Sequence, residues 1–238
     1  MEQRLTKVCE DCVVRDRSLC GTLDDAALTE MSRLGRRRKL AAGESLQFEG
    51  DDNILCANVL GGVLKLSSLT PSGDAQTVGL LYPADFIGRP YADTVDHDIT
   101  ALTEAEVCIF ARAPFERMMA ENIQLERQLL ERTLSELERS RRWLLFLGRK
   151  SASARLAGLI IDIDRRMAQT GCGADLGIGQ LIQLPLTRTE MADVLGLTIE
   201  TVSREIGKLK DAGVIATEGR RGLRILKPAA LKAIMDSE

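Results

Sequence analysis

The sequence has a single histidine, His97, among 238 residues, and aromatic residues make up only 3%. One imidazole cannot form a histidine-rich metal site, and most histidine-based mechanisms need a second oriented group. No apolar run exceeds five residues, as in 143–147, whereas a membrane helix needs about 18. The first seven residues do not lead into the apolar stretch of a secretory signal peptide. We therefore expect a cytoplasmic protein with no membrane partner and with reduced cysteines.

The motifs of common enzyme classes are missing as well. The sequence shows no nucleophile elbow, no P-loop and no paired carboxylates that point to a pocket. Any metal chemistry must come from the six cysteines or from carboxylates. A metal-dependent enzyme is therefore the weakest hypothesis, and we expect that the protein is not an enzyme.

Charge is unevenly distributed along a chain of ordinary globular composition. Hydrophobic residues make up 45% and charged residues 28%. Residues 148–238 carry 14 Lys and Arg against 11 Asp and Glu, which leaves 18 against 24 in residues 1–147. A mildly basic C-terminal part behind an acidic N-terminal part gives a weak indication of nucleic-acid binding.

The N-terminal half is typical of a small antiparallel β-roll. A short helix is expected over 23–35, opened by Asp24 and ended near Gly35. From Arg36 to Arg112, turn-forming groups separate short apolar runs at roughly ten-residue spacing, which favours antiparallel strands. We assign residues 1–22 to a cysteine-rich segment and 23–113 to the roll.

A long helix is predicted to follow, and residues 114–147 are assigned to it. Residues 115–147 contain no Gly or Pro. Apolar residues recur with the alternation of four and three that is typical of a coiled-coil seam. We expect two chains to pair through this helix, with one charged residue in the seam: Leu130, Leu134, Leu137, Arg141 and Leu144.

The last domain, 148–238, contains a helix-turn-helix pattern. Small Ala192 lets two helices cross closely, and Gly196 permits the left-handed turn between them. Thr198 is expected to cap the second helix. Residues 213–226 resemble a basic β-hairpin, which predicts a wing. Arg can bind guanine and Glu can accept from cytosine. The predicted contacts to double-stranded DNA are Thr187, Arg188, Thr198, Glu200, Ser203, Arg204 and Lys208.

The segment Thr198–Arg204, with Glu200-x-x-Ser203-Arg204 at its centre, resembles the recognition helix of the FNR branch of the CRP/FNR transcription regulators. The order of roll, long helix and winged helix-turn-helix is similar to that family over essentially the whole chain. The resemblance implies an α+β fold with a cupin-like, cyclic-nucleotide-binding-domain-like roll. It also implies a homodimer that binds palindromic sites resembling TTGAT-N4-ATCAA and contacts RNA polymerase, for example through Pro71–Asp74.

Cys9, Cys12 and Cys20 form a compact group of thiols near the N-terminus. In a reducing compartment this spacing indicates metal ligation rather than disulfides. Three ligands leave one place open, for which the candidates are Cys56, Cys108 and Cys172.

The resemblance selects among these candidates. In FNR-type oxygen sensors a fourth cysteine lies on a late strand of the roll, just before the dimer helix, and Val107-Cys108-Ile109-Phe110 matches that place. By similarity, Cys9, Cys12, Cys20 and Cys108 would hold a [4Fe-4S] cluster. A zinc ion on the same thiolates and a cluster-free regulator of the nitrogen-oxide or nitrogen-fixation type are the alternatives. Cys56 is expected to be a buried strand residue and Cys172 a loop residue.

A cyclic nucleotide is not expected as a partner. In the related cyclic-AMP regulators the roll holds the cyclic phosphate with a glycine-glutamate turn and an arginine. The matching stretch here contains Gly88-Arg89-Pro90, and Asp96 and Asp98 follow, which would repel a phosphate. His97 between them is expected to be a surface loop residue.

The resemblance also implies a switch that acts through assembly. An intact cluster would tie the N-terminal segment to the roll beside the dimer helix and so favour pairing. Arg141 in the seam would weaken pairing. It would leave the monomer–dimer equilibrium easily shifted, because a free-energy change of about 1.4 kcal/mol changes the equilibrium constant tenfold.

Overall fold

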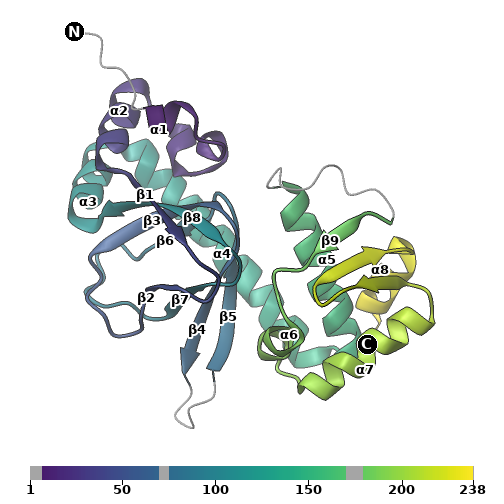
Figure 1. The fold of residues 1–238 in the computed structure, drawn as a ribbon. Helices are drawn as coiled ribbons and strands as arrows, with labels where there is room; N and C mark the ends of the chain where they lie inside the picture. The colour runs from purple at the N-terminus through teal and green to yellow at the C-terminus, as the bar shows by residue number, and fades with distance from the viewer. Residues whose placement is uncertain (1–6, 70–74, 170–178, 238) are drawn as a thin grey trace. The chain divides into compact units, whose positions relative to one another are not determined.

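The computed structural model describes residues 7–69, 75–169 and 179–237 (Figure 1). The chain divides into two compact units. The first comprises residues 1–68 and 78–138, and the second comprises residues 69–77 and 139–238. The first contains a β-roll and the second a winged helix-turn-helix, so the expected α+β fold is confirmed. Within these ranges, no helix has the length and apolar character needed to cross a membrane.

The roll in the first unit consists of two four-stranded sheets. Their strand orders are β1-β8-β3-β6 and β2-β7-β4-β5, and the pairs β1–β8, β3–β8, β3–β6, β2–β7 and β4–β7 are antiparallel. The strands are β1 (Arg36–Leu40), β2 (Ser45–Gln47), β3 (Leu55–Gly61), β4 (Leu64–Leu69), β5 (Ala75–Leu81), β6 (Phe86–Ile87), β7 (Asp98–Ala101) and β8 (Ala105–Ala111).

Side chains of β3 and β8 alternate between two apolar clusters, as the two-residue period of a strand requires. Ala57 and Val107 point into the core between the sheets. Their neighbours face the other side, where Cys56 and Phe110 join a second cluster. Cys108 lies on this outer face, with Arg37 and Asn58 as its partners on β1 and β3.

Short helices lie against this outer face of the sheet. They come from the N-terminal segment and from the residues after β8: α1 (Lys7–Glu10), η1 (Arg15–Arg17), η2 (Leu19–Thr22), α2 (Asp25–Leu34) and α3 (Arg112–Glu121). Figure 1 shows α1, α2 and α3 gathered near β1. Asp24 accepts a hydrogen bond from the backbone N–H of Ala27, so it caps α2 as predicted.

The predicted single helix over 114–147 is wrong in one respect, because two helices occupy this part of the chain. α3 ends at Glu121, and α4 (Ile123–Arg149) begins after Asn122. Asn122 has an extended backbone, and its side-chain oxygen accepts hydrogen bonds from the N–H groups of Gln124 and Leu125 at 3.1 Å each. An asparagine therefore caps the second helix where the prediction looked only for Gly and Pro. At the other end, α4 continues to Arg149, two residues beyond the assigned end at residue 147.

Among its described residues, the second unit has a three-stranded antiparallel sheet and four helices after α4. The sheet order is β10-β11-β9. The elements are α5 (Ala152–Gln169), β9 (Leu181–Gln183), α6 (Arg188–Leu195), α7 (Ile199–Asp211), β10 (Ile215–Glu218), β11 (Gly222–Ile225) and α8 (Pro228–Asp236). A Cβ at Gly158 would lie 2.2 Å from the ring of Phe146, so glycine allows α5 to pack closely against α4.

Candidate cysteine site and nucleic-acid interface

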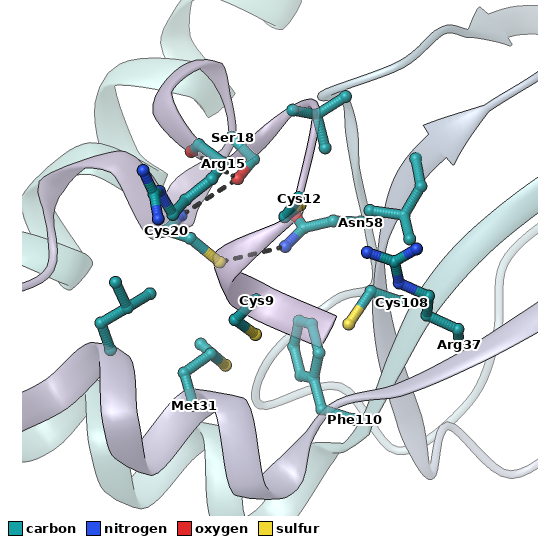
Figure 2. A pocket seen from close by; sticks show the side chains of 13 residues that line it. Cys9, Cys12, Arg15, Ser18, Cys20, Met31, Arg37, Asn58, Cys108 and Phe110 are labelled. Atoms are coloured by element: carbon teal, nitrogen blue, oxygen red, sulfur yellow. Dashed lines mark hydrogen bonds between the residues drawn. The ribbon is translucent and has the colours of Figure 1, made fainter. Parts of the chain in front are cut away.

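Four cysteines line one cavity of the first unit (Figure 2). Cys9 lies on α1, Cys12 follows it, Cys20 lies on η2 and Cys108 lies on β8. The structure thus brings together the four residues that the sequence and the resemblance nominated. The cavity is small, about 20 Å³. Such a volume holds about one water molecule.

Local packing fixes the segment that carries three of these thiols. Val14 and Leu19 are fully buried, and Val14 packs with Leu60 of β3. The Ser18 hydroxyl donates to the carbonyl oxygen of Arg15 at 3.0 Å and accepts from the N–H of Cys20 at 3.3 Å. These contacts turn the chain back, so that Cys20 faces the sheet.

Two glycines permit close contacts around the site, one within the cysteine segment and one against Cys108 of β8. A Cβ at Gly21 would lie 2.6 Å from the carbonyl oxygen of Asp16. A Cβ at Gly35 would lie 2.9 Å from the Sγ atom of Cys108. Any larger residue at Gly35 would therefore press on the candidate ligand from β8.

Burial holds the thiols of Cys20 and Cys108 in their protonated form. Desolvation raises the pKa of Cys108 to about 12, and charge on Cys20, Cys9 or Cys12 would raise it further. Desolvation likewise raises the pKa of Cys20 to about 11, while the hydrogen bond from Ser18 opposes this shift. A bound cation is what would hold several thiolates together here, because metal binding displaces the protons of its ligands.

Asn58 is a site residue that the sequence did not reveal. It is only 2% exposed, and its Nδ2 group donates a hydrogen bond to the Sγ atom of Cys20 at 3.8 Å. Its Oδ1 atom has no hydrogen-bond partner in the part of the chain that the structure describes. No local pattern marks this asparagine, because the register of β3 against β8 is what brings it to the cysteines.

The ligand type and the convergence of the four side chains both fit a metal group bound by thiolates. Four thiols converge from the N-terminal segment and from β8, and four thiolates are the ligands of iron-sulfur clusters and of structural zinc. Among the described residues, however, no three His, Cys, Asp or Glu side chains stand close enough to hold a metal ion. Because the cavity has a volume of only about 20 Å³, a group larger than a water molecule requires the segment 9–20 to lie further from β8.

The dimerisation prediction concerns exposed side chains of α4. Leu130, Leu134, Leu137 and Leu144 are 57%, 55%, 44% and 71% exposed, and Arg141 is exposed as well. The seam assignment stays a prediction, but α4 presents to solvent the residues that it requires.

The helix-turn-helix of the second unit forms at the predicted residues. Thr187 and Glu190 cap α6 reciprocally, and Gly196 has the left-handed φ of +60°. The Thr198 hydroxyl accepts from the N–H of Thr201 and so caps α7. The small core between the two helices contains the buried residues Val194, Leu195, Val202 and Ile206, with Leu197 half-buried beside them.

Most candidate DNA contacts on α7 are exposed. Glu200, Arg204 and Lys208 are exposed, and Ser203 is partly so. Hydrogen bonds from its own backbone N–H and from Thr198 lower the pKa of Glu200, so its carboxylate is charged at the start of the helix. Thr187 is partly exposed and Arg188 is exposed at the start of α6.

Glu205 organises the two basic side chains and was missed by sequence reasoning. It is only 4% exposed, and its Oε1 atom lies 2.8 Å from Nζ of Lys208 and 3.5 Å from Nε of Arg204. One buried carboxylate thus holds both cations toward the exposed face of α7. Beside it, β10 and β11 form the predicted wing, with Arg220 exposed at its turn.

Other predicted residues fall outside this site. Cys56 is fully buried in the outer-face cluster, as expected for a strand residue. Cys172 and the Pro71–Asp74 loop lie outside the described residues. His97 is half-buried and lines a cavity of about 160 Å³ in the roll, where its Nδ1 atom lies 2.7 Å from the Ser68 hydroxyl.

The same cavity in the roll contains Arg89, which forms an ion pair with Asp96. The arginine charge is thus neutralised by the carboxylate expected to repel a phosphate. That a cyclic nucleotide is not a partner stays a prediction.

Comparison with known proteins assigns both units. The Crp-like helix-turn-helix domain matches residues 154–234, and the cyclic nucleotide-binding domain matches residues 37–122. The transcriptional activator protein FnrL of Cereibacter sphaeroides is 43% identical over 213 residues, covering 90% of this chain and 86% of FnrL. The nitrogen fixation regulation protein FixK of Bradyrhizobium diazoefficiens is 38% identical over 226 residues, covering 95% and 93%.

Solved structures show the same architecture. The structure of FixK2 from Bradyrhizobium japonicum superposes with a TM-score of 0.76 at 24% identity, covering 86% of this chain and 98% of that one. At this identity the likeness establishes the fold alone. Together with the relatives, the two domain matches show that the chain belongs to the CRP/FNR family of DNA-binding transcription regulators, which are not enzymes.

Proposed function

We propose that this chain is an oxygen-responsive transcription activator of the cytoplasm that carries a [4Fe-4S] cluster on Cys9, Cys12, Cys20 and Cys108. The single observation that carries this proposal is the convergence of these four thiols on one cavity. The activity printed in the names of FnrL and its relatives agrees with it.

The cysteine segment packs against the first turns of α4, which links the cluster site to assembly. Leu19 and Leu125 are both fully buried in one apolar cluster, and Cys20 and Leu129 pack against it. A bound cluster would supply an oxygen-labile tie between this segment and β8. With the tie in place, the apolar cluster keeps the start of α4 fixed and supports pairing through Leu130, Leu134, Leu137, Arg141 and Leu144.

In the paired state, two copies of α7 would enter successive major grooves of an inverted repeat resembling TTGAT-N4-ATCAA. Glu200, Ser203 and Arg204 would contact base edges. Lys208, Thr187 and Arg188 would contact phosphates, and Thr198 fixes the start of the helix. As an activator, the dimer would also contact RNA polymerase.

The test is anaerobic purification followed by an absorption spectrum and by iron and sulfide counts. We expect about four irons per chain and a broad band near ~400 nm that bleaches in air. The Cys20→Ser and Cys108→Ser variants should lose the iron, while Cys56→Ser should keep it, because Cys56 does not line the cavity of the four thiols.

Two other results would replace the proposal. A colourless, iron-free protein that binds the repeat would be a cluster-free regulator, as a second candidate. Among the described residues, no three His, Cys, Asp or Glu side chains lie close enough to hold a metal ion, which favours this candidate. Zinc bound by the same four cysteines would make them structural and would remove the oxygen response.

A further inference from the structure

Arg132 of α4 connects the dimerisation helix to two other parts of the first unit. Its Nη1 group donates a hydrogen bond to the carbonyl oxygen of Ala84 at 3.0 Å. Its Nη2 group donates to the carbonyl oxygen of Arg17. These partners lie 48 and 115 residues away in the sequence. One guanidinium therefore joins α4, the roll and the N-terminal segment.

The Arg17 carbonyl belongs to the loop between two of the candidate ligands. Arg17 ends η1, after Cys12 and before Cys20. The side chain of Ser18, the next residue, accepts from the N–H of Cys20. A displacement of Cys12 or Cys20 would therefore move the acceptor that Arg132 holds.

The second acceptor lies in a turn with a strained backbone. Ala84 has a φ of +80°, which a non-glycine residue rarely adopts, and the N–H of Asp85 donates to the carbonyl oxygen of Tyr82 at 2.9 Å. Ala84 is buried and packs with Val14 of the cysteine segment. Both partners of Arg132 are thus connected to that segment, one covalently and one by packing.

Packing alone does not explain why an arginine occupies position 132. Burial lowers the pKa of Arg132, and its Nε atom has no hydrogen-bond partner among the described residues. Because an incompletely paired guanidinium is costly to desolvate, an apolar side chain would serve packing better. The charge of Asp85 in the roll favours the guanidinium, but its hydrogen bonds go to the two carbonyl oxygens, and these are available together only while the segment is docked.

We propose that Arg132 is the positioning residue through which the cysteine segment sets the first turns of α4, an inference that rests on the proposed function. When the segment is docked, the guanidinium bridges Arg17 and Ala84 and holds the helix against the roll. When the segment leaves, one acceptor is lost and the guanidinium turns toward water. The helix turn that it anchors lies between the seam residues Leu130 and Leu134, so the geometry of pairing changes with it.

The experiment is hydrogen exchange on the full chain, purified without iron, for Arg132→Gln and Arg132→Lys. The control is Arg117→Gln, which removes the same charge from an exposed position on α3. We expect Arg132→Gln to raise exchange at least tenfold in both 9–22 and 125–135. Arg132→Lys, which keeps the charge but loses the planar fork, should give a smaller rise in both segments. The control should match the parent chain.

A rise in only one segment, or in neither, would overturn the coupling. Because this readout needs no iron, it separates the Arg132 proposal from the cluster proposal, which the iron count decides. A second measurement uses the anaerobic protein in a sedimentation experiment. Arg132→Gln should keep its metal content and dimerise at least tenfold more weakly, whereas loss of the metal itself would assign Arg132 to the ligand site and overturn its role as a link.

Discussion

The side-chain amide of Asn58 donates a hydrogen bond to the sulfur of Cys20 across 3.8 Å. Asn58 also lies opposite Cys108 in the register of β3 and β8, so one buried amide contacts Cys20 of the N-terminal segment and neighbours Cys108 of the sheet. Donors aimed at sulfur ligands tune iron-sulfur clusters, and groups behind the ligands support metal affinity. An asparagine with an unpaired oxygen in this place is thus better suited to a metal site than to an apolar core.

Replacing Asn58 by Leu should separate the effect of this residue on folding stability from its effect on metal binding. In the iron-free chain, the substitution removes an unpaired buried oxygen and one weak hydrogen bond, so the free energy of unfolding should change by no more than about 1 kcal/mol. In the anaerobic protein, loss of the donor should weaken metal retention about tenfold. Thermal unfolding measures the first effect and iron release to a chelator measures the second. Unchanged iron release would show that Asn58 does not support the site.

Arg204 and Lys208 should contribute differently to DNA binding. Both are exposed on α7, but Arg204 lies in the part of the helix that the resemblance assigns to base contacts. Arg204→Gln should cost about 1–3 kcal/mol on the TTGAT repeat and little on unrelated DNA. Lys208→Gln should weaken binding to all sequences and reduce the slope of log affinity against log salt by about 1. Fluorescence anisotropy over a salt series measures both, and identical salt slopes for the two variants would contradict the assignment.

Glu205→Gln tests whether the buried carboxylate orients these two cations. The carboxylate accepts from Lys208 at 2.8 Å and lies 3.5 Å from Arg204, and the amide keeps its shape but loses its charge. We expect about tenfold weaker binding to the repeat, or about 1.4 kcal/mol, because both side chains lose their anchor. Removing a negative charge by itself should favour DNA binding. Asp211→Asn, at the exposed end of α7, makes that same charge change and should bind the repeat at least as tightly as the parent chain.

Sequence reasoning succeeded where the signal is local. Thr187, Gly196 and Thr198 mark the ends of α6 and α7 by cap and turn chemistry that needs only neighbouring residues. The convergence of Cys108 with the N-terminal cysteines had a different source, since only the resemblance to a family singled it out from Cys56 and Cys172.

Three of the four misses have a common physical cause. Asn58, Arg132 and Glu205 owe their roles to partners that tertiary packing brings to them, or to burial that a helix pattern does not reveal in a charged residue. Asn122 was missed for a local reason, because it lies in a run without Gly or Pro and caps the start of α4 through its own side chain. A polar residue that caps a helix is easily taken for part of that helix.

Replacing Arg141 by Leu tests the seam of α4. Arg141 occupies the seam position between Leu137 and Leu144, so pairing of two chains would place two like charges close together, while leucine would fill that position with an apolar side chain. We expect dimerisation about tenfold tighter, a gain of about 1.4 kcal/mol, and dimer that persists in air. Analytical ultracentrifugation measures the equilibrium. Arg142→Leu adds the same apolar surface one residue away, outside the seam, and should leave the equilibrium unchanged. If Arg141→Leu stays monomeric in air, or if both variants associate equally, the residues that pair are not Leu130, Leu134, Leu137, Arg141 and Leu144.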